Sequence, residues 1–339
     1  MIARHKIIPI FVPHKGCPND CIFCNQKKIS GQIEEMTTKK IPQIIETHLA
    51  TMEPDDEVEI AFYGGSFTAI DPSIQESFLA EAFHYTNNGR ISQIRVSTRP
   101  DSISEENLSM LWKYGVRTIE LGVQSLDDEV LRKSCRGHDA SCVVQASALI
   151  KRMGFILGIQ TMTGLPGDTN KSCLETAEKV IRISPDIVRI YPVLVIKGTE
   201  LERQYHNGSY KPQSLEEAVD LCAQLLEMYE SNHIKVIRIG LQATDQIRKG
   251  SGSDVVVGPV HPAFRQLVES KLMLLRIEAA IKKQGLSGAA RLTIHTGSSN
   301  ISNVVGQNRS NIHYLLSQYD IGNIRVSASE ELSRELILS

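Results

Sequence analysis

The stretch IRVSTRPDSISEENLSMLWKYGVRTIELGV (residues 94–123) decides the fold class of this chain. It opens with an apolar, β-branched run, continues through a helix candidate at Ser104–Tyr114 and closes with a second apolar run. Ser104 followed by Asn107 is a weak helix cap, and Gly115 separates the helix from the second run. This order predicts two parallel strands joined by a covering helix.

The same alternation extends in both directions along the chain. Further strands are predicted at Lys6–Val12, Val58–Tyr63, Phe155–Thr161, Ile187–Tyr191 and Ile234–Ile239, beside those at Ile94–Ser97 and Thr118–Val123. Further helices are predicted at Asp139–Met153, Asn170–Ile183 and Ser214–Tyr229, the last with a capping-box spacing. Roughly six strand–helix units therefore predict an α/β fold, either an open sheet or a barrel, with sites at the C-terminal ends of the strands.

Composition narrows the class of protein. The 339 residues are 41% hydrophobic and 22% charged, as in ordinary soluble domains, and the formal net charge is −2. That charge excludes a strongly basic protein that coats nucleic acid, but it allows a local basic face. No apolar run approaches the roughly 18 residues that span a bilayer, and the N-terminus resembles no cleaved signal. A cytoplasmic protein without a membrane segment is expected.

The strand–helix rhythm changes after residue 240. The stretch RKGSGSD (248–254) is the best candidate for a flexible connection, so a boundary is expected near 240–255. The predicted domains are a core over residues 1–240 and a C-terminal extension over residues 241–339.

Three of the seven cysteines, Cys17, Cys21 and Cys24, lie close together in GCPNDCIFCNQ (16–26). Thiolates at C-x3-C-x2-C spacing can wrap one metal centre from a single loop, and they leave one position open for a substrate or cofactor. On spacing alone, a three-cysteine iron–sulfur site and a zinc loop completed by His14 both stay open. The scattered cysteines are expected to be buried small hydrophobic residues: Cys135, Cys142, Cys173 and Cys222.

The cysteine loop resembles that of the radical S-adenosylmethionine (SAM) enzymes, with Phe23 as the aromatic residue before the third cysteine. The resemblance is sharpened by an ordered series of motifs: AFYGGSFT (61–68), VSTRPD (96–101), ELGVQS (120–125), RGH (136–138), TGLPGDT (163–169) and RIYPVLVIKGTEL (189–201). Together they resemble the subgroup that contains the catalytic subunit of Elongator, a tRNA-modifying enzyme, and more distantly oxygen-independent coproporphyrinogen oxidase.

The resemblance implies a partial (β/α)6 barrel, a [4Fe–4S] cluster on Cys17, Cys21 and Cys24, and SAM bound at the unligated iron. It implies one-electron cleavage of SAM to methionine and a 5′-deoxyadenosyl radical that abstracts a substrate hydrogen. An electron donor such as flavodoxin or ferredoxin is implied as a partner. The implied SAM contacts are Phe23 on the adenine, then Gly64, Gly65, Ser66, Gln124, Arg136 and Gln160.

Departures and alternatives accompany these assignments. Ser97 stands where relatives commonly have Glu, and Gln160 stands where coproporphyrinogen oxidase has an acidic residue. Arg136 could instead form a surface ion pair with Asp139, and Gln124 could be a buried structural amide. The candidates to face the substrate, each about as well explained as structural, are His138 and Tyr191.

The C-terminal extension begins with VGPVHPAFRQLVES (257–270), which resembles the same subgroup, but too little chain follows to hold the acetyltransferase domain of Elongator. Residues 291–328 predict strand–helix–turn–helix–strand, and this order resembles an RNA-binding KH core. The candidate RNA-binding loop is Gly306, Gln307, Asn308 and Arg309, with Arg309 in place of the second KH glycine. A small α/β cap without RNA contact is the alternative.

The sequence thus predicts a radical SAM enzyme acting on tRNA or another RNA. The first alternative is a radical SAM enzyme acting on a small molecule such as a tetrapyrrole. The second is a non-catalytic, metal-binding RNA adaptor. The sequence names neither the substrate atom, nor the fate of SAM, nor the oligomeric state.

Overall fold

A computed structural model describes residues 4–12, 17, 21–25, 36–241 and 253–339. The described chain forms two compact units. The first comprises Met1–Gln213 and Tyr229–Val260, and the second comprises Ser214–Met228 and His261–Ser339. The predicted division into residues 1–240 and 241–339 stays a prediction. Most of the predicted connection RKGSGSD lies outside the described residues.

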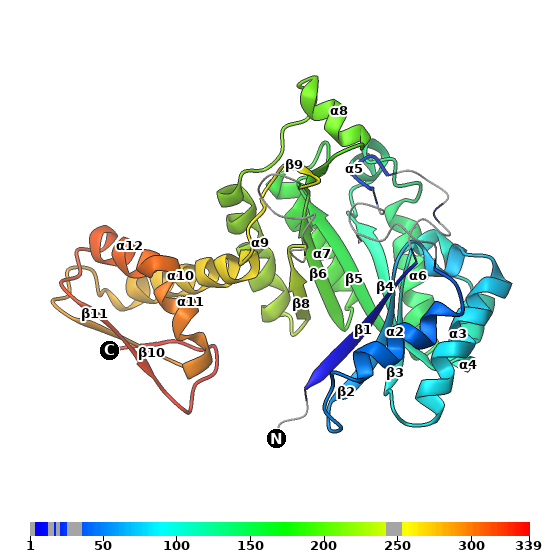
Figure 1. Ribbon diagram of the computed structural model, residues 1–339. Helices are drawn as coiled ribbons and strands as arrows, with labels where there is room; N and C mark the ends of the chain where they lie inside the picture. Colours follow the sequence, from blue (N-terminus) through cyan, green and yellow to red (C-terminus); the bar gives the residue numbers. More distant parts are fainter. Residues whose placement is uncertain (1–3, 13–16, 18–20, 26–35, 242–252) are drawn as a thin grey trace. The chain divides into compact units, whose positions relative to one another are not determined.

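The first unit is built on a parallel sheet whose strands follow chain order (Figure 1). Within the described residues the sheet has seven strands in the order β1-β2-β3-β4-β5-β6-β8. Their bounds are β1 (His5–Val12), β2 (Glu57–Gly64), β3 (Gln93–Thr98), β4 (Val116–Gln124), β5 (Ile156–Thr163), β6 (Ile187–Pro192) and β8 (Lys235–Ile239). All seven predicted strands are confirmed, and the half-barrel α/β architecture agrees with the expected fold class.

The sheet has one apolar face and one face that carries polar groups. One face is apolar and buried, as Ile8, Ile60 and Ile119 show, and it packs under the helices. The other face carries polar groups such as Glu59 and Glu120. The helices in contact with the strands are α2 (Lys40–Leu49), α3 (Pro72–Asn87), α4 (Glu105–Lys113), α6 (Ala140–Arg152) and α7 (Asn170–Ile183) (Figure 1).

Local capping explains where α4 and α7 begin. Ser104 accepts from the Asn107 backbone N–H at 3.2 Å, so the predicted cap of α4 is confirmed. Thr169 and Ser172 form a reciprocal capping box at the start of α7. The remaining helices of this unit are α5 (Asp128–Lys133) and α8 (Glu200–His206), and a short antiparallel pair joins β7 (Val195–Ile196) to β9 (Val255–Val257). Helix α9 (Leu215–Ser231) contains the boundary between the units.

The second unit contains the predicted strand–helix–turn–helix–strand order. After α10 (Phe264–Gln284) come β10 (Leu292–Thr296), α11 (Ile301–Val305), α12 (Ser310–Gln318), β11 (Ile324–Ala328) and β12 (Ile337–Leu338). The sheet order is β11-β10-β12, with β10 parallel to β11 and antiparallel to β12. Helices α11 and α12 both pack on α10, and this packing buries Ile312 and Leu315.

Candidate functional site

The cysteine loop follows β1, and its described residues are Cys17 and residues 21–25. The backbone turns tightly where Cys24 N–H donates to the Cys21 carbonyl at 3.0 Å. Ile22 anchors this turn on both sides: its N–H donates to the Ser134 carbonyl and its carbonyl accepts from Leu201 N–H at 2.8 Å. His14, the candidate fourth ligand of the zinc alternative, lies outside the described part.

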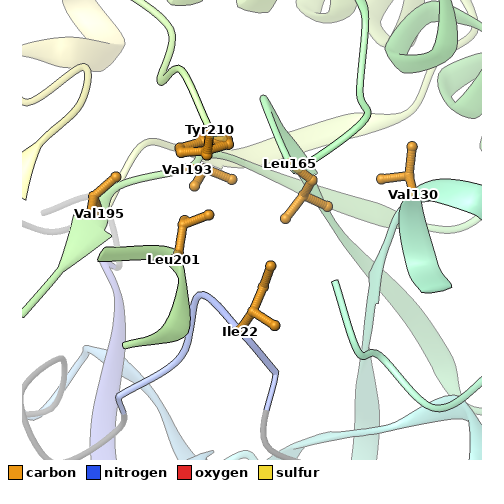
Figure 2. Close-up of a cluster of buried hydrophobic side chains, with 7 residues drawn as sticks. All are labelled: Ile22, Val130, Leu165, Val193, Val195, Leu201 and Tyr210. Atoms are coloured by element: carbon orange, nitrogen blue, oxygen red, sulfur yellow. The ribbon is translucent and has the colours of Figure 1, made fainter. Parts of the chain in front are cut away.

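The apolar part of the loop sits in a buried cluster (Figure 2). Ile22 is 5% exposed in this cluster, and Phe23 packs against it while staying partly buried. The buried members come from the loop, from α5 and α8 and from the segments after β5 and β6, and they are Ile22, Val130, Leu165, Val193, Val195, Leu201 and Tyr210. This packing holds the cysteine loop to α5, to α8 and the segment after it, and to the segments that follow β5 and β6.

Cationic side chains surround the loop thiols. Arg136 is 7% exposed, and its Nη1 donates to the Sγ of Cys21 at 3.3 Å. Arg99 in turn donates through Nη2 to the Arg136 carbonyl at 2.5 Å and pairs with Asp101. Burial raises the pKa of the Cys17 thiol, and the Ser66 backbone N–H, Arg136 and Arg99 oppose this rise. The site therefore contains fixed donors suited to thiolate sulfur.

The end of β2 approaches β1 very closely at Gly64. Gly64 has φ +110°, and a Cβ there would lie 3.1 Å from the Val12 backbone. The next residue, Gly65, donates its N–H to the Val12 carbonyl at 3.0 Å. The Ser66 hydroxyl is fully buried and bonds Thr98 Oγ1 at 2.9 Å. Ser66 thus offers its backbone N–H, rather than its hydroxyl, to the cysteine loop.

The predicted glutamines lie together at the ends of β4 and β5. Gln160 Nε2 donates to Gln124 Oε1 at 3.3 Å. The strand pairing shifts between Gly122 and Gln124, and Gln124 has φ 71°. This irregularity changes the direction of the backbone, and with it that of the Gln124 side chain, at the end of β4. Arg136 Nη2 donates to the Gly122 carbonyl at 2.5 Å. The structure therefore brings Cys21, Gln124, Arg136 and Gln160 into one neighbourhood.

Gly122 is a site residue that the sequence argument missed. A Cβ at this position would lie 2.9 Å from both Arg136 Nη2 and Gln124 Nε2. A larger residue there would displace the ends of these two side chains from the strand. The available signal was its place in ELGVQS, two residues after Glu120 and two before Gln124 on the same face of the strand. The alternative of a surface ion pair between Arg136 and Asp139 is not realised, because Arg136 is buried and Asp139 caps α6.

A buried ion network on the polar face of the sheet was also missed. Arg95 donates to Glu59 at 2.7 Å and to Glu120 at 2.6 Å, and Arg189 donates to Glu120 at 2.9 Å and to the Tyr63 hydroxyl at 2.8 Å. The side chains of Arg95, Glu59 and Glu120 are each at most 7% exposed. Charges at alternate positions of buried parallel strands were the available signal, because such strands are ordinarily apolar throughout.

This network includes a carboxylate close to Ser97, the residue that stands where relatives commonly have Glu. Ser97 pairs in register with Glu120, so a carboxylate stands on the neighbouring strand. That carboxylate is already engaged by Arg95 and Arg189. Gly158 provides the space for it, since a Cβ there would lie 2.8 Å from Glu120 Cγ.

His138 and Tyr191 differ in their surroundings. Neither ring nitrogen of His138 has a well-formed hydrogen bond within the described chain. Burial, followed by the charge of Arg136, lowers the pKa of His138 to about 4, although Asp101 opposes the shift. The Tyr191 hydroxyl accepts from Arg189 Nη1 at 3.3 Å, which attaches Tyr191 to the ion network.

The expectation that the scattered cysteines are buried was wrong for two of them. Cys173 and Cys222 are buried, but Cys135 is exposed and Cys142 is half-buried. Cys135 follows the end of α5 in a left-handed turn with φ 51°, so its side chain points out of the apolar core.

The predicted RNA loop connects α11 to α12 in the second unit. Gly306 has φ +75°, and a Cβ there would lie 2.6 Å from Ser310 Oγ. Asn308 and Arg309 both adopt left-handed backbone, with φ 52° and 61°. Gln307, Asn308 and Arg309 are exposed. The arginine in place of the second KH glycine thus carries a conformation that glycine would adopt without strain.

The three thiols fit an iron–sulfur centre by donor chemistry: they lie on one short loop, and a guanidinium contacts one of them. This fit is one of donor chemistry and not of geometry, because no three His, Cys, Asp or Glu side chains of the described residues, these thiols included, are arranged as a metal site. A search of the described helices found none with the length and hydropathy of a membrane span.

Comparison with known proteins gives two family matches. Residues 11–180 match the Radical SAM superfamily, and residues 185–273 match the Radical_SAM C-terminal domain. A tRNA uridine(34) acetyltransferase of Methanocaldococcus infernus is 28% identical over 266 residues, which cover 66% of this chain and 49% of that protein. Elongator complex protein 3 of Saccharomyces cerevisiae is 30% identical over 194 residues, covering 51% of this chain and 35% of that protein.

A solved structure of Methanocaldococcus infernus Elp3 with an N-terminal deletion shares the fold, with a TM-score of 0.64 and 21% identity. The alignment covers 89% of this chain and 68% of that one. The chain spans about half the length of the first curated relatives that it matches. A [4Fe–4S] cluster and SAM are the cofactors of the matched superfamily. With its cysteine loop, half-barrel sheet and both family matches, this chain belongs to the radical SAM superfamily of enzymes.

Proposed function

We propose that this chain is an RNA-modifying radical SAM enzyme, with tRNA as its substrate class. The observation that carries the proposal is the convergence of Cys21, Arg136, Gln124 and Gln160 at the C-terminal ends of the strands. Parallel α/β sheets bind ligands at that edge. The tRNA-modifying activity named for the relatives supports the choice of substrate.

Cys17, Cys21 and Cys24 would hold the cluster. A bound cluster and SAM would together supply the 5′-deoxyadenosyl radical that removes a hydrogen atom from the substrate. The chain's own residues would orient SAM. Phe23 would face the adenine, the backbone of Gly64, Gly65 and Ser66 would meet the methionine, and Gln124, Arg136 and Gln160 would supply further polar contacts.

Arg136 has a second task in this proposal. Its Nη1 donates to Cys21 and its Nη2 donates to Gly122, so one guanidinium links a cluster ligand to β4. A planar guanidinium suits this double contact because its donors diverge in a fixed geometry. The proposal further includes a cytoplasmic location, where thiolate ligands persist, and an electron donor such as flavodoxin or ferredoxin.

The cofactor part of the proposal is tested by anaerobic purification. The protein should be brown and carry about four iron atoms per chain. Cys17→Ala, Cys21→Ala and Cys24→Ala should each abolish the colour and the formation of 5′-deoxyadenosine from SAM. Cys142→Ala, a half-buried cysteine on α6, is the matched control and should retain both. Tight stoichiometric zinc, with no cluster after reconstitution, would falsify this part.

The substrate part is tested in cells. Modified nucleosides in total tRNA would be compared between wild-type and deletion strains, and the deletion would be complemented with wild-type or Cys21→Ala protein. A nucleoside that disappears and returns only with the wild-type protein supports RNA modification. An unchanged RNA profile, combined with active SAM cleavage, would replace RNA by a small-molecule substrate.

A further inference from the structure

The second unit contains a pocket that the cofactor chemistry does not use. Its volume is about 560 Å³, within the range of roughly 300–1,000 Å³ typical of ligand sites. It lies between the helix pair α11–α12 and the strands β10 and β11. We call it the basic pocket, and its lining residues are Arg291, Thr293, Ile301, Val305, Arg309, Ile312, Asn323, Ile324, Arg325 and Val326.

The lining of the basic pocket is mixed, with an aliphatic part beside the polar residues. Ile312 is 1% exposed and Ile324 is 8% exposed, while Ile301, Val305 and Val326 are half-buried. This aliphatic part of the lining offers an apolar surface to a flat group, with the arginines beside it.

The helix pair beside the pocket is held firmly in place. The side-chain amide of Asn311 is buried and donates to the Ser270 carbonyl at 2.9 Å and to the Asn303 carbonyl at 3.1 Å. These bonds tie the start of α12 to α10 and to α11. The two helices on one side of the pocket are therefore fixed relative to each other and to α10.

The rim of the pocket is cationic. Arg291, Arg309 and Arg325 are all exposed, and no lining residue is acidic. Within the described residues, the guanidinium groups of these three arginines form no ion pair and no hydrogen bond. Residues 241–339 carry eleven Lys and Arg against eight Asp and Glu, so this segment is positive in a chain whose net charge is −2.

One wall of the pocket is a sheet edge. Strand β11 pairs with β10 on one side, and no described strand pairs with its other side. Such an edge presents unpaired backbone N–H and C=O groups. Asn323, Ile324, Arg325 and Val326, which belong to this edge or adjoin it, all line the pocket.

We propose that the basic pocket binds a single-stranded segment of the RNA substrate. A base would lie on the aliphatic part of the lining, its polar edge would meet the free edge of β11, and neighbouring phosphates would contact the three arginines. The proposal rests on RNA being the substrate, as proposed above. An added peptide strand would also use the sheet edge, but three unpaired arginines without an acidic neighbour favour a polyanion.

The backbone of Arg309 supplies a sharp test. Its left-handed conformation disfavours every residue with a Cβ, and glycine would adopt it freely. Arg309→Gly should therefore raise or preserve the thermal midpoint while it weakens RNA binding. A merely structural arginine would not separate these two measurements. Gly306 is unsuitable for the test, because any side chain there collides with Ser310 and Asn311.

The experiment measures binding of the full chain to a fluorescently labelled single-stranded RNA at about 50 and 200 mM salt. The variants are Arg309→Gly, Arg325→Gln and Arg291→Gln. Lys283→Gln, an exposed residue in the last turn of α10 and outside the pocket lining, is the matched control. Each phosphate contact to a single strand contributes about 0.7 to the salt slope, so each pocket variant should lose about fivefold in affinity near 0.1 M salt.

The outcomes separate the two proposals. Weakening in the pocket variants, with the control like wild type, supports the basic pocket. Equal RNA binding by all four variants and wild type would overturn it and leave RNA modification standing. Displacement of the RNA by an extended acidic peptide, with no effect of the arginine variants, would overturn it in favour of a protein partner. Wild-type protein that binds RNA but never cleaves SAM would instead overturn the proposed function.

Discussion

Arg136 and Cys21, which lie 115 residues apart in the chain, meet through a hydrogen bond of 3.3 Å from Nη1 to Sγ. The same guanidinium donates to the Gly122 carbonyl, so it joins the cysteine loop to β4. The backbone carbonyl of Arg136 accepts a hydrogen bond from the guanidinium of Arg99, so a second cationic side chain contacts Arg136. This arrangement suggests that Arg136 serves the cluster ligand as well as the SAM contact implied by its motif.

Arg136→Ala should weaken cluster retention. It removes a hydrogen bond to sulfur and one to a buried carbonyl, and a bond to a charged group is worth about 1.5–3 kcal/mol. Iron affinity after reconstitution should therefore fall roughly 10- to 150-fold. Iron content and the visible spectrum would be followed against chelator concentration. Arg132→Ala, an exposed arginine paired with Glu129 on α5, is the control, and an equal loss of iron in both variants would contradict the assignment.

Phe23→Ala should keep the cluster and weaken SAM binding. Stacking of an aromatic ring on a base is worth about 1–3 kcal/mol, so SAM affinity should drop roughly 5- to 150-fold. Phe23 also packs against the buried cluster around Ile22, and a loss of core packing must be separated from a loss of stacking. Tyr205→Ala removes another ring packed on that same cluster, and it should leave SAM affinity unchanged. Loss of iron in Phe23→Ala alone would mark Phe23 as a packing residue.

Glu120→Gln should destabilise the fold strongly. The substitution leaves Arg95 and Arg189 buried beside a neutral amide, and breaking a buried ion pair costs about 3–5 kcal/mol. Urea denaturation would show this loss as a lower free energy of unfolding. Glu129→Gln breaks an exposed pair on α5 and should change stability little. Matching denaturation curves for the two variants would show that the network contributes no net stability.

Acidification should destabilise the native state through His138. The pKa of His138 is about 4 in the fold, against 6.5 for an unperturbed histidine, because burial and Arg136 disfavour its charged form. Above about pH 6.5 both states are neutral and the group contributes nothing. As the pH falls from about 6.5 to about 4, the unfolded chain binds a proton that the native chain does not, so stability falls.

The test compares denaturation midpoints at about pH 7 and pH 5 for wild type, His138→Gln and His206→Gln. His138→Gln should flatten the dependence on pH over this interval. His206→Gln alters an exposed histidine at the end of α8 and should follow wild type. A slope in His138→Gln equal to that of wild type would assign the pH dependence to other groups.

The polar face of the sheet shows which contacts the sequence pattern could not predict. Strand β4 was predicted at Thr118–Val123 and runs over Val116–Gln124, but nothing in that run states that Glu120 meets Arg95 and Arg189. Each partner belongs to a different strand, and the strand register decides which side chains are neighbours. The cysteine trio, by contrast, is local, so its spacing was readable directly.

The basic pocket is a similar case. The sequence placed Arg309 in a turn between two helices, and the structure confirms those helices. Arg291 and Arg325 join Arg309 only because β10 and β11 pair in parallel beside the helix pair. A pocket lined by residues that are tens of positions apart leaves no periodic trace in the sequence.

The sequence by itself determined the strands of the seven-stranded sheet, the ends of helices such as α4 and α6, and the family, because apolar periodicity, capping residues and the cysteine spacing are short-range properties. Helix α7 was predicted with its observed bounds, Asn170–Ile183, and the structure shows that Thr169 and Ser172 cap it locally. Only the tertiary structure decided that Arg136 contacts Cys21 and that Gln160 contacts Gln124. Those contacts depend on the order and register of the strands, and they join residues that are far apart in the sequence. Strand order and register follow from the packing of the whole sheet rather than from any local sequence pattern.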